Sequence, residues 1–101
     1  EALPFLFARE GVGAPFQVGE YWDKTVQIDL VGWREDCWTD IGECKWGDHI
    51  SGRQLRDELE TKVARYPNRR NATIGRRLFT RNPLRARLSD VRCHSLADLY
   101  A

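Results

Sequence analysis

Two acidic residues and a lysine stand inside strongly apolar stretches of the sequence between Val26 and Trp46. Asp29 lies in the run VQIDLVGW, and Glu43 and Lys45 lie in the run DIGECKW. Charged side chains within apolar strands usually need a reason, because burying an unpaired charge is costly. Two carboxylates beside an ammonium group suggest a site that holds a divalent metal ion and activates water.

These two runs predict two antiparallel strands, over residues 25–33 and 37–46, joined by a tight turn. Alternation puts Val26, Ile28 and Leu30 on one face of the first strand, and Gln27, Asp29 and Val31 on the other. A three-residue turn over Glu35–Cys37 would set Asp29 directly opposite Glu43, with Cβ atoms about 5 Å apart. A turn of another length would shift this pairing by one or two positions.

Two carboxylates at that distance repel each other unless a proton or a cation lies between them. Mg²⁺ or Mn²⁺ would resolve the conflict with oxygen ligands and retained waters. Lys45, two residues after Glu43, should project from the same face and stabilise charge on a phosphate. Cys44 should turn inward, which leaves its carbonyl group free to join the metal ligands. A solvated pair of surface charges is the alternative.

The remaining elements would support this hairpin. Residues 16–22 predict a strand, and Ser51 predicts the N-cap of a helix to about Tyr66, with a buried stripe of Leu55, Leu59 and Val63. Further predictions are a helix remnant over residues 1–9, a strand over 72–80 parallel to the second hairpin strand, a short turn or helix over 83–88, a strand over 90–94 and a terminal helix after Ser95.

The charge is divided between the two halves of the chain. Residues 1–50 carry a net charge of −6, and residues 51–101 carry +7. Arginine matches the geometry of phosphate oxygens, so the basic half predicts a DNA-binding surface, with an ordinary solvated helix face as the alternative. The candidate residues are Arg53, Arg56, Arg65, Arg69, Arg70, Arg76 and Arg77.

The composition argues against several classes of protein. A chain of 101 residues suits a single domain, and it has no apolar run long enough for a membrane helix. Three cysteines are too few for a disulfide scaffold, so a reduced, cytoplasmic chain is expected. No recurring zinc-binding spacing relates Cys37, Cys44, His49, Cys93 and His94.

The hairpin motif resembles a known family. Gln27-Ile-Asp-Leu-Val31 followed by Ile41-Gly-Glu-Cys-Lys-Trp46 resembles the PD-(D/E)XK nuclease superfamily, and more closely the C-terminal domain of unknown function of archaeal-type, AAA+-like ATPases. The resemblance implies an α/β, restriction-endonuclease-like fold: a mixed sheet flanked by helices. It also implies Asp29 and Glu43 as metal ligands and Lys45 as the catalytic lysine. Ile28 precedes the first acid, where the superfamily motif has proline.

The resemblance further implies that an ATPase module precedes this domain. The chain contains no methionine, so we expect residues 1–101 to be a C-terminal fragment whose N-terminal helix is cut short. The expected activity is Mg²⁺- or Mn²⁺-dependent hydrolysis of DNA phosphodiesters. The alternative is a non-catalytic module of that ATPase that binds DNA or protein.

Overall fold

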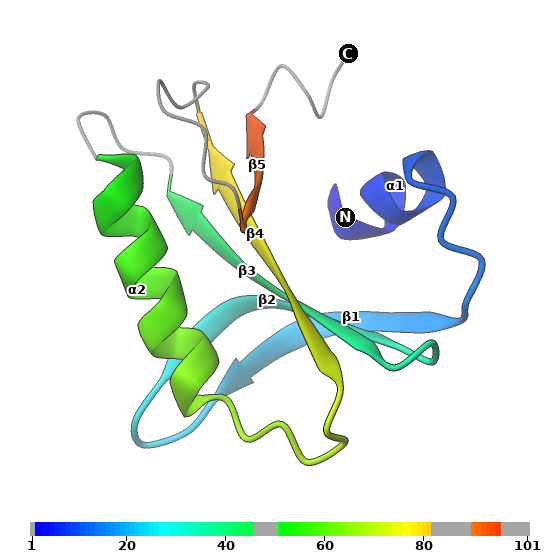
Figure 1. Ribbon diagram of the computed structural model, residues 1–101, viewed down its shortest axis with the longest axis horizontal. Coiled ribbons are helices and arrows are strands. Elements are labelled where there is room, and N and C mark those ends of the chain that lie inside the picture. Colours follow the sequence, from blue (N-terminus) through cyan, green and yellow to red (C-terminus); the bar gives the residue numbers. More distant parts are fainter. Residues whose placement is uncertain (1, 46–50, 82–89, 96–101) are drawn as a thin grey trace.

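The computed structural model describes residues 2–45, 51–81 and 90–95, which form a five-stranded sheet with a helix on each face (Figure 1). The elements in chain order are α1 (Ala2–Arg9), β1 (Phe16–Trp22), β2 (Gln27–Arg34), β3 (Trp38–Lys45), α2 (Gly52–Arg65), β4 (Thr73–Thr80) and β5 (Arg92–Ser95). The short element predicted over 83–88, the helix after Ser95, Trp46 and His49 all lie outside the described residues.

The strands lie in the sheet in the same order as in the chain. The pairs β1–β2 and β2–β3 are antiparallel, whereas β3–β4 and β4–β5 are parallel. Because two parallel strands cannot be joined by a tight turn, the chain crosses from β3 to β4 through α2. The predicted mixed sheet flanked by helices, and the predicted parallel pairing of residues 72–80, are both confirmed.

The β2–β3 hairpin has the predicted three-residue turn. Cys37 closes the turn with a φ of 70°, the left-handed conformation that a three-residue hairpin loop commonly needs at this position. The pairs run from Trp33–Thr39 to Leu30–Gly42. This register is the one that the sequence predicts.

A bulge in β2 interrupts the predicted alternation of side chains. Gly19 of β1 pairs with Val31 of β2, and Tyr21 pairs with Ile28. One residue therefore separates the paired positions on β1, whereas two residues separate them on β2. Ile28 and Val31 therefore both join the buried cluster under α2. The prediction that Leu30 shares a face with Ile28, and Val31 with Asp29, is wrong because the extra residue reverses the alternation after Asp29.

Helix α2 covers one face of the sheet. The hydroxyl of Ser51 accepts a hydrogen bond from the backbone N–H of Gln54 at 3.1 Å, which confirms the predicted N-cap. Leu55 and Leu59 are buried against the sheet, and Val63 packs partly against the same cluster. Each buried leucine contributes about 1.5–3 kcal/mol to folding, so this stripe holds α2 over β3 and β4.

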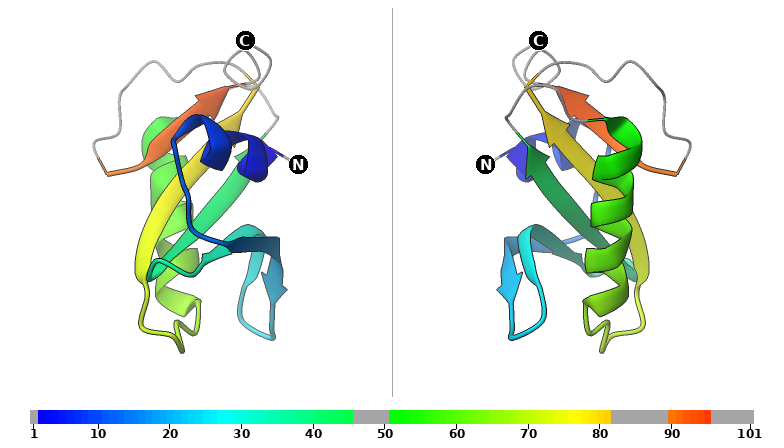
Figure 2. Two further views of the ribbon diagram at one scale, coloured as in Figure 1. Left: turned by 90° about the vertical axis from the view of Figure 1, so that its right-hand side faces the viewer. Right: turned by 90° about the vertical axis from the view of Figure 1, so that its left-hand side faces the viewer.

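Helix α1 covers the opposite face, as the two side views show (Figure 2). Leu3, Leu6 and Phe7 are buried there. A Cβ atom at Gly32 would lie 2.6 Å from the Leu3 Cδ2 atom, so the glycine lets α1 approach the backbone of β2. Neither α1 nor α2, the helices of the described ranges, has the length and apolar character needed to cross a membrane.

Candidate functional site

Strand β3 carries Glu43 and Lys45 on the sheet face that α2 covers. The Lys45 Nζ atom lies 3.8 Å from Glu43 Oε1 and 3.5 Å from Glu58 Oε2 on α2. Residues two apart on a strand point to the same face, so this arrangement follows from the predicted alternation. Figure 1 shows α2 running beside this part of β3.

Asp29 lies at the bulge of β2, next to the same part of β3. The β2–β3 ladder reaches Leu30–Gly42, one position short of the predicted Asp29–Glu43 pair. Even so, Asp29 Oδ2 accepts a hydrogen bond from the Cys44 backbone N–H at 3.5 Å. The negative charge of Asp29 also raises the pKa of both Glu43 and Cys44, after the larger effect of burial. The bulge therefore directs the Asp29 carboxylate toward Glu43 and Cys44.

The carboxylate of Glu43 is almost entirely buried, with 2% of the residue exposed. Burial raises its pKa above the ordinary value, and the neighbouring charge of Asp29 adds to this, while Lys62 and Lys45 act against it. Lys62 Nζ contacts Glu43 Oε2 as an ion pair. The ammonium group of Lys62 thus meets the buried carboxylate oxygen directly.

The residues on α2 that complete this cluster, Glu58 and Lys62, were not among the predicted site residues. They lie four residues apart and therefore on the same side of the helix. Glu58 follows Leu55 by three residues, and Lys62 follows Leu59 by three. Both charged residues therefore border the buried stripe of a helix that was predicted to pack against the hairpin. This position was the signal in the sequence that could have identified them as site residues.

The arrangement suits a divalent ion held by few protein ligands. Asp29 and Glu43 offer hard carboxylate oxygens, and the buried Oε2 of Glu43 already pairs with a cation, the ammonium group of Lys62. Mg²⁺ commonly uses one or two carboxylates and keeps several waters. Within residues 2–45, 51–81 and 90–95, no three Asp, Glu, His or Cys side chains gather around one point. Burial raises the pKa of the Cys44 thiol, so the thiolate form of Cys44 is disfavoured.

The arginines predicted to bind DNA do not gather on one surface. Arg56 pairs with Asp90 at 2.8 Å, and Arg76 pairs with Glu60. Arg53 is exposed at the start of α2, whereas the exposed arginines at positions 69 and 70 follow its other end. Since α2 has 14 residues, about 21 Å of helix separates these two groups.

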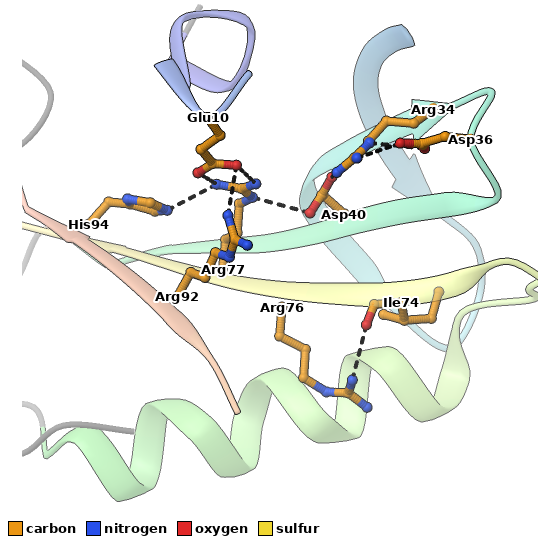
Figure 3. Close-up of polar contacts among 9 residues, drawn as sticks. All are labelled: Glu10, Arg34, Asp36, Asp40, Ile74, Arg76, Arg77, Arg92 and His94. Carbon is orange, nitrogen blue, oxygen red and sulfur yellow. Dashed lines mark hydrogen bonds and ion pairs between the residues drawn. The ribbon is translucent and has the colours of Figure 1, made fainter. Parts of the chain in front are cut away.

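Arg77 does not lie on a solvent-facing surface. Its guanidinium group is 1% exposed and donates two hydrogen bonds to Glu10, at 2.7 and 2.8 Å. It donates another to Asp40 at 3.2 Å and lies 3.2 Å from His94 Nε2 (Figure 3). Arg92 also contacts Glu10, at 2.8 Å. Arg77 therefore joins α1 to the sheet, and its guanidinium holds the pKa of Glu10 below the ordinary value.

Neighbouring residues on a strand point to opposite faces, as Figure 3 shows for Arg76 and Arg77. The period of two was thus enough to predict that these arginines could not share one surface. The same rule separates Cys93, which packs under α2, from His94, whose ring lies 5.1 Å from that of Phe79. Cys93 and His94 therefore lie on opposite faces of the sheet.

A family model matches most of the chain. The model of a family described as archaea bacterial proteins of unknown function, DUF234, matches residues 1–74, a range that includes Asp29, Glu43, Lys45 and Lys62. No curated protein and no solved structure matches the chain.

Proposed function

This chain belongs to the DUF234 family, and we propose that it is a divalent-metal-dependent nuclease-like domain that hydrolyses DNA phosphodiesters. The observation that carries the proposal is the convergence of Asp29, Glu43 and Lys45. Lys45 pairs with Glu43 at 3.8 Å, and Asp29 accepts a hydrogen bond from the backbone of the next residue, Cys44, beside a bulge, where strands often redirect functional side chains. The family itself is of unknown function, so the support for this function comes from these side chains and from the resemblance of the hairpin motif to PD-(D/E)XK nucleases.

In this proposal Asp29 and Glu43 would hold Mg²⁺ or Mn²⁺, with the Cys44 carbonyl as a third oxygen ligand. The ion would supply Lewis acidity for a water molecule and a phosphate oxygen. Lys45 orients the attacking water and stabilises negative charge on the phosphate as it develops. Glu58, 3.5 Å from the Lys45 ammonium, keeps that ammonium near Glu43 while the substrate is absent.

The proposal also includes the parent protein and the substrate. An ATPase module would precede this domain and bring DNA to it. The exposed Arg53 would contact a phosphate, since it borders a shallow hollow of about 360 Å³ along α2 that also includes Gln54 and Glu58. The exposed arginines at positions 69 and 70 would contact a more distant part of the DNA backbone.

The test is cleavage of supercoiled plasmid in the presence of Mg²⁺ or Mn²⁺. Lys45→Ala and Asp29→Asn should each lower the cleavage rate by about 100-fold or more, the usual range for removing one catalytic group. Lys24→Ala is the matched control, because Lys24 is an exposed lysine in the β1–β2 turn. Equal cleavage by Lys45→Ala and Lys24→Ala would disprove the nuclease assignment.

A non-catalytic module that binds DNA or protein is the second candidate. The specific observation in its favour is that Lys62 already neutralises Glu43, as a cation would in a nuclease site. This candidate predicts salt-dependent binding of labelled DNA without Mg²⁺, and no strand cleavage. Fluorescence anisotropy with a labelled duplex, followed by gel analysis of the same samples, separates the two functions.

A further inference from the structure

Lys62 is the one lysine on α2, and its ammonium group lies at the most buried carboxylate of the candidate site. Glu43 is 2% exposed, whereas the side chain of Lys62 is 24% exposed. Lys62 therefore reaches from the half-open surface of the helix to an oxygen that water does not reach. This contact is not part of the nuclease chemistry described above.

The position of Lys62 conflicts with metal binding. An ammonium group against Glu43 Oε2 blocks access to that oxygen, and its positive charge repels a divalent cation at close range. Without the ammonium, however, the buried Glu43 carboxylate and the nearby Asp29 would lack this nearby balancing charge. Either Lys62 permanently replaces the ion, or the two cations exchange.

The surroundings of Lys62 favour exchange. Its four-carbon stem is flexible, so the ammonium group can change position without any movement of the helix backbone. Glu58, which pairs with Lys45 at 3.5 Å, lies one turn earlier on the same side of α2 and is 41% exposed, so its carboxylate can also accept Lys62 at the edge of the site. Lys62 can thus leave Glu43 without losing every carboxylate partner.

We propose that Lys62 is a built-in counter-ion that keeps the Glu43 carboxylate paired until a divalent cation displaces it, which makes Lys62 a competitor of the metal. The proposal rests on the proposed function only for the claim that Asp29 and Glu43 bind a metal. In this proposal Lys62 controls the access of the metal ion to Glu43 and takes no part in catalysis. Metal binding would release the ammonium of Lys62 toward Glu58 and solvent.

The first experiment measures Mn²⁺ affinity by isothermal titration calorimetry. Lys62→Gln should bind Mn²⁺ about five- to tenfold more tightly than the unmodified protein, the factor that loss of a competing ion pair would produce. Lys24→Gln, which removes an exposed lysine far from the site, should bind within about twofold of the unmodified protein. Equal or weaker binding by Lys62→Gln would overturn the proposal.

The second experiment uses the unmodified protein and so does not depend on the folding of a variant. Reductive methylation followed by mass spectrometry should modify Lys62 more slowly than Lys24 without metal, and saturating Mg²⁺ should speed the modification of Lys62 alone. Unchanged protection of Lys62 in Mg²⁺ would mean that the lysine is a permanent substitute, and the proposal would fall.

The outcomes also separate this inference from the proposed function. Equal Mn²⁺ binding by the unmodified protein and Lys62→Gln would remove the gating part while leaving the metal site intact. Binding by Lys62→Gln alone would support both. No binding by either protein at millimolar Mn²⁺ would refute the metal site and the gate together.

Discussion

Removing the buried guanidinium of Arg77 should destabilise the fold far more than removing the exposed guanidinium of Arg92. Both arginines contact Glu10 Oε1, at 2.7 and 2.8 Å, so the two pairs have the same chemistry and nearly the same length. They differ in burial, because the side chain of Arg77 is 1% exposed and that of Arg92 is 64% exposed. Arg92→Met is therefore a matched control for Arg77→Met.

The expected sizes follow from burial. Breaking a buried pair on one side leaves an uncompensated charge and costs about 3–5 kcal/mol. Arg77→Met would remove the buried donor from both Glu10 and Asp40, which would keep only their contacts with Arg92 and Arg34 within the described residues. An exposed pair contributes about 0–1 kcal/mol, so Arg92→Met should have a small effect. With about 4 °C per kcal/mol for a domain of this size, Arg77→Met should lower Tm by about 12–20 °C.

Urea unfolding followed by tryptophan fluorescence, together with calorimetry, measures both variants. Glu10→Gln combined with Arg77→Met should recover part of the loss, because the double variant no longer contains a Glu10 carboxylate that has lost the Arg77 guanidinium. A loss below about 1 kcal/mol for Arg77→Met, or equal losses for the two arginine variants, would refute the reasoning from burial.

Three further predictions concern the elements around the site. Ser51→Ala should lower the free energy of unfolding by about 0.5–2 kcal/mol through loss of the α2 N-cap, measured in urea. Gly32→Ala should cost about 1–3 kcal/mol by pushing α1 away from β2, whereas Gly13→Ala, whose Cβ would meet no atom within 4 Å, should change the stability by less than about 0.5 kcal/mol. The pKa of Glu10 is lowered in the folded protein, so its ionised form stabilises the fold above the ordinary pKa of 4.5. This stabilisation is lost as the pH falls through the lowered pKa. The unmodified protein should therefore lose more stability on acidification than Glu10→Gln does.

Each of these has an outcome that contradicts it. An unchanged urea midpoint for Ser51→Ala would mean that the cap does not stabilise α2. Equal stability of the two glycine variants would show that α1 can shift without cost. Parallel acid-unfolding curves for Glu10→Gln and the unmodified protein would exclude Glu10 as a source of pH dependence.

Local sequence patterns were sufficient to predict the hairpin and the crossover. The apolar runs on both sides of Glu35–Cys37, and the Ser51 cap followed by leucines four residues apart, are signals that neighbouring residues determine. The placement of Lys45 beside Glu43 followed from the period of two. These features depend on short-range geometry, which residues close together in the sequence determine.

The features that the sequence did not predict depend on contacts between distant elements. The bulge at Asp29 depends on how β1 pairs with β2, and no Gly or Pro in the run from Ile28 to Val31 marks it. The contact of Lys62 with Glu43 requires the rotation of α2 over the sheet. The burial of Arg77 required knowing that α1 brings Glu10 to the other face.

The pairing of Glu10 with Arg77 also orders events during synthesis of the chain. Arg77 is made 67 residues after Glu10, which at 5–20 residues per second is a delay of about 3–13 s. During that interval α1 and the β1–β3 meander can pack through Leu3 and Gly32, but Arg77 of β4, which pairs with Glu10, has not yet been made. Strand β4 thus fastens a helix that was made several seconds before it.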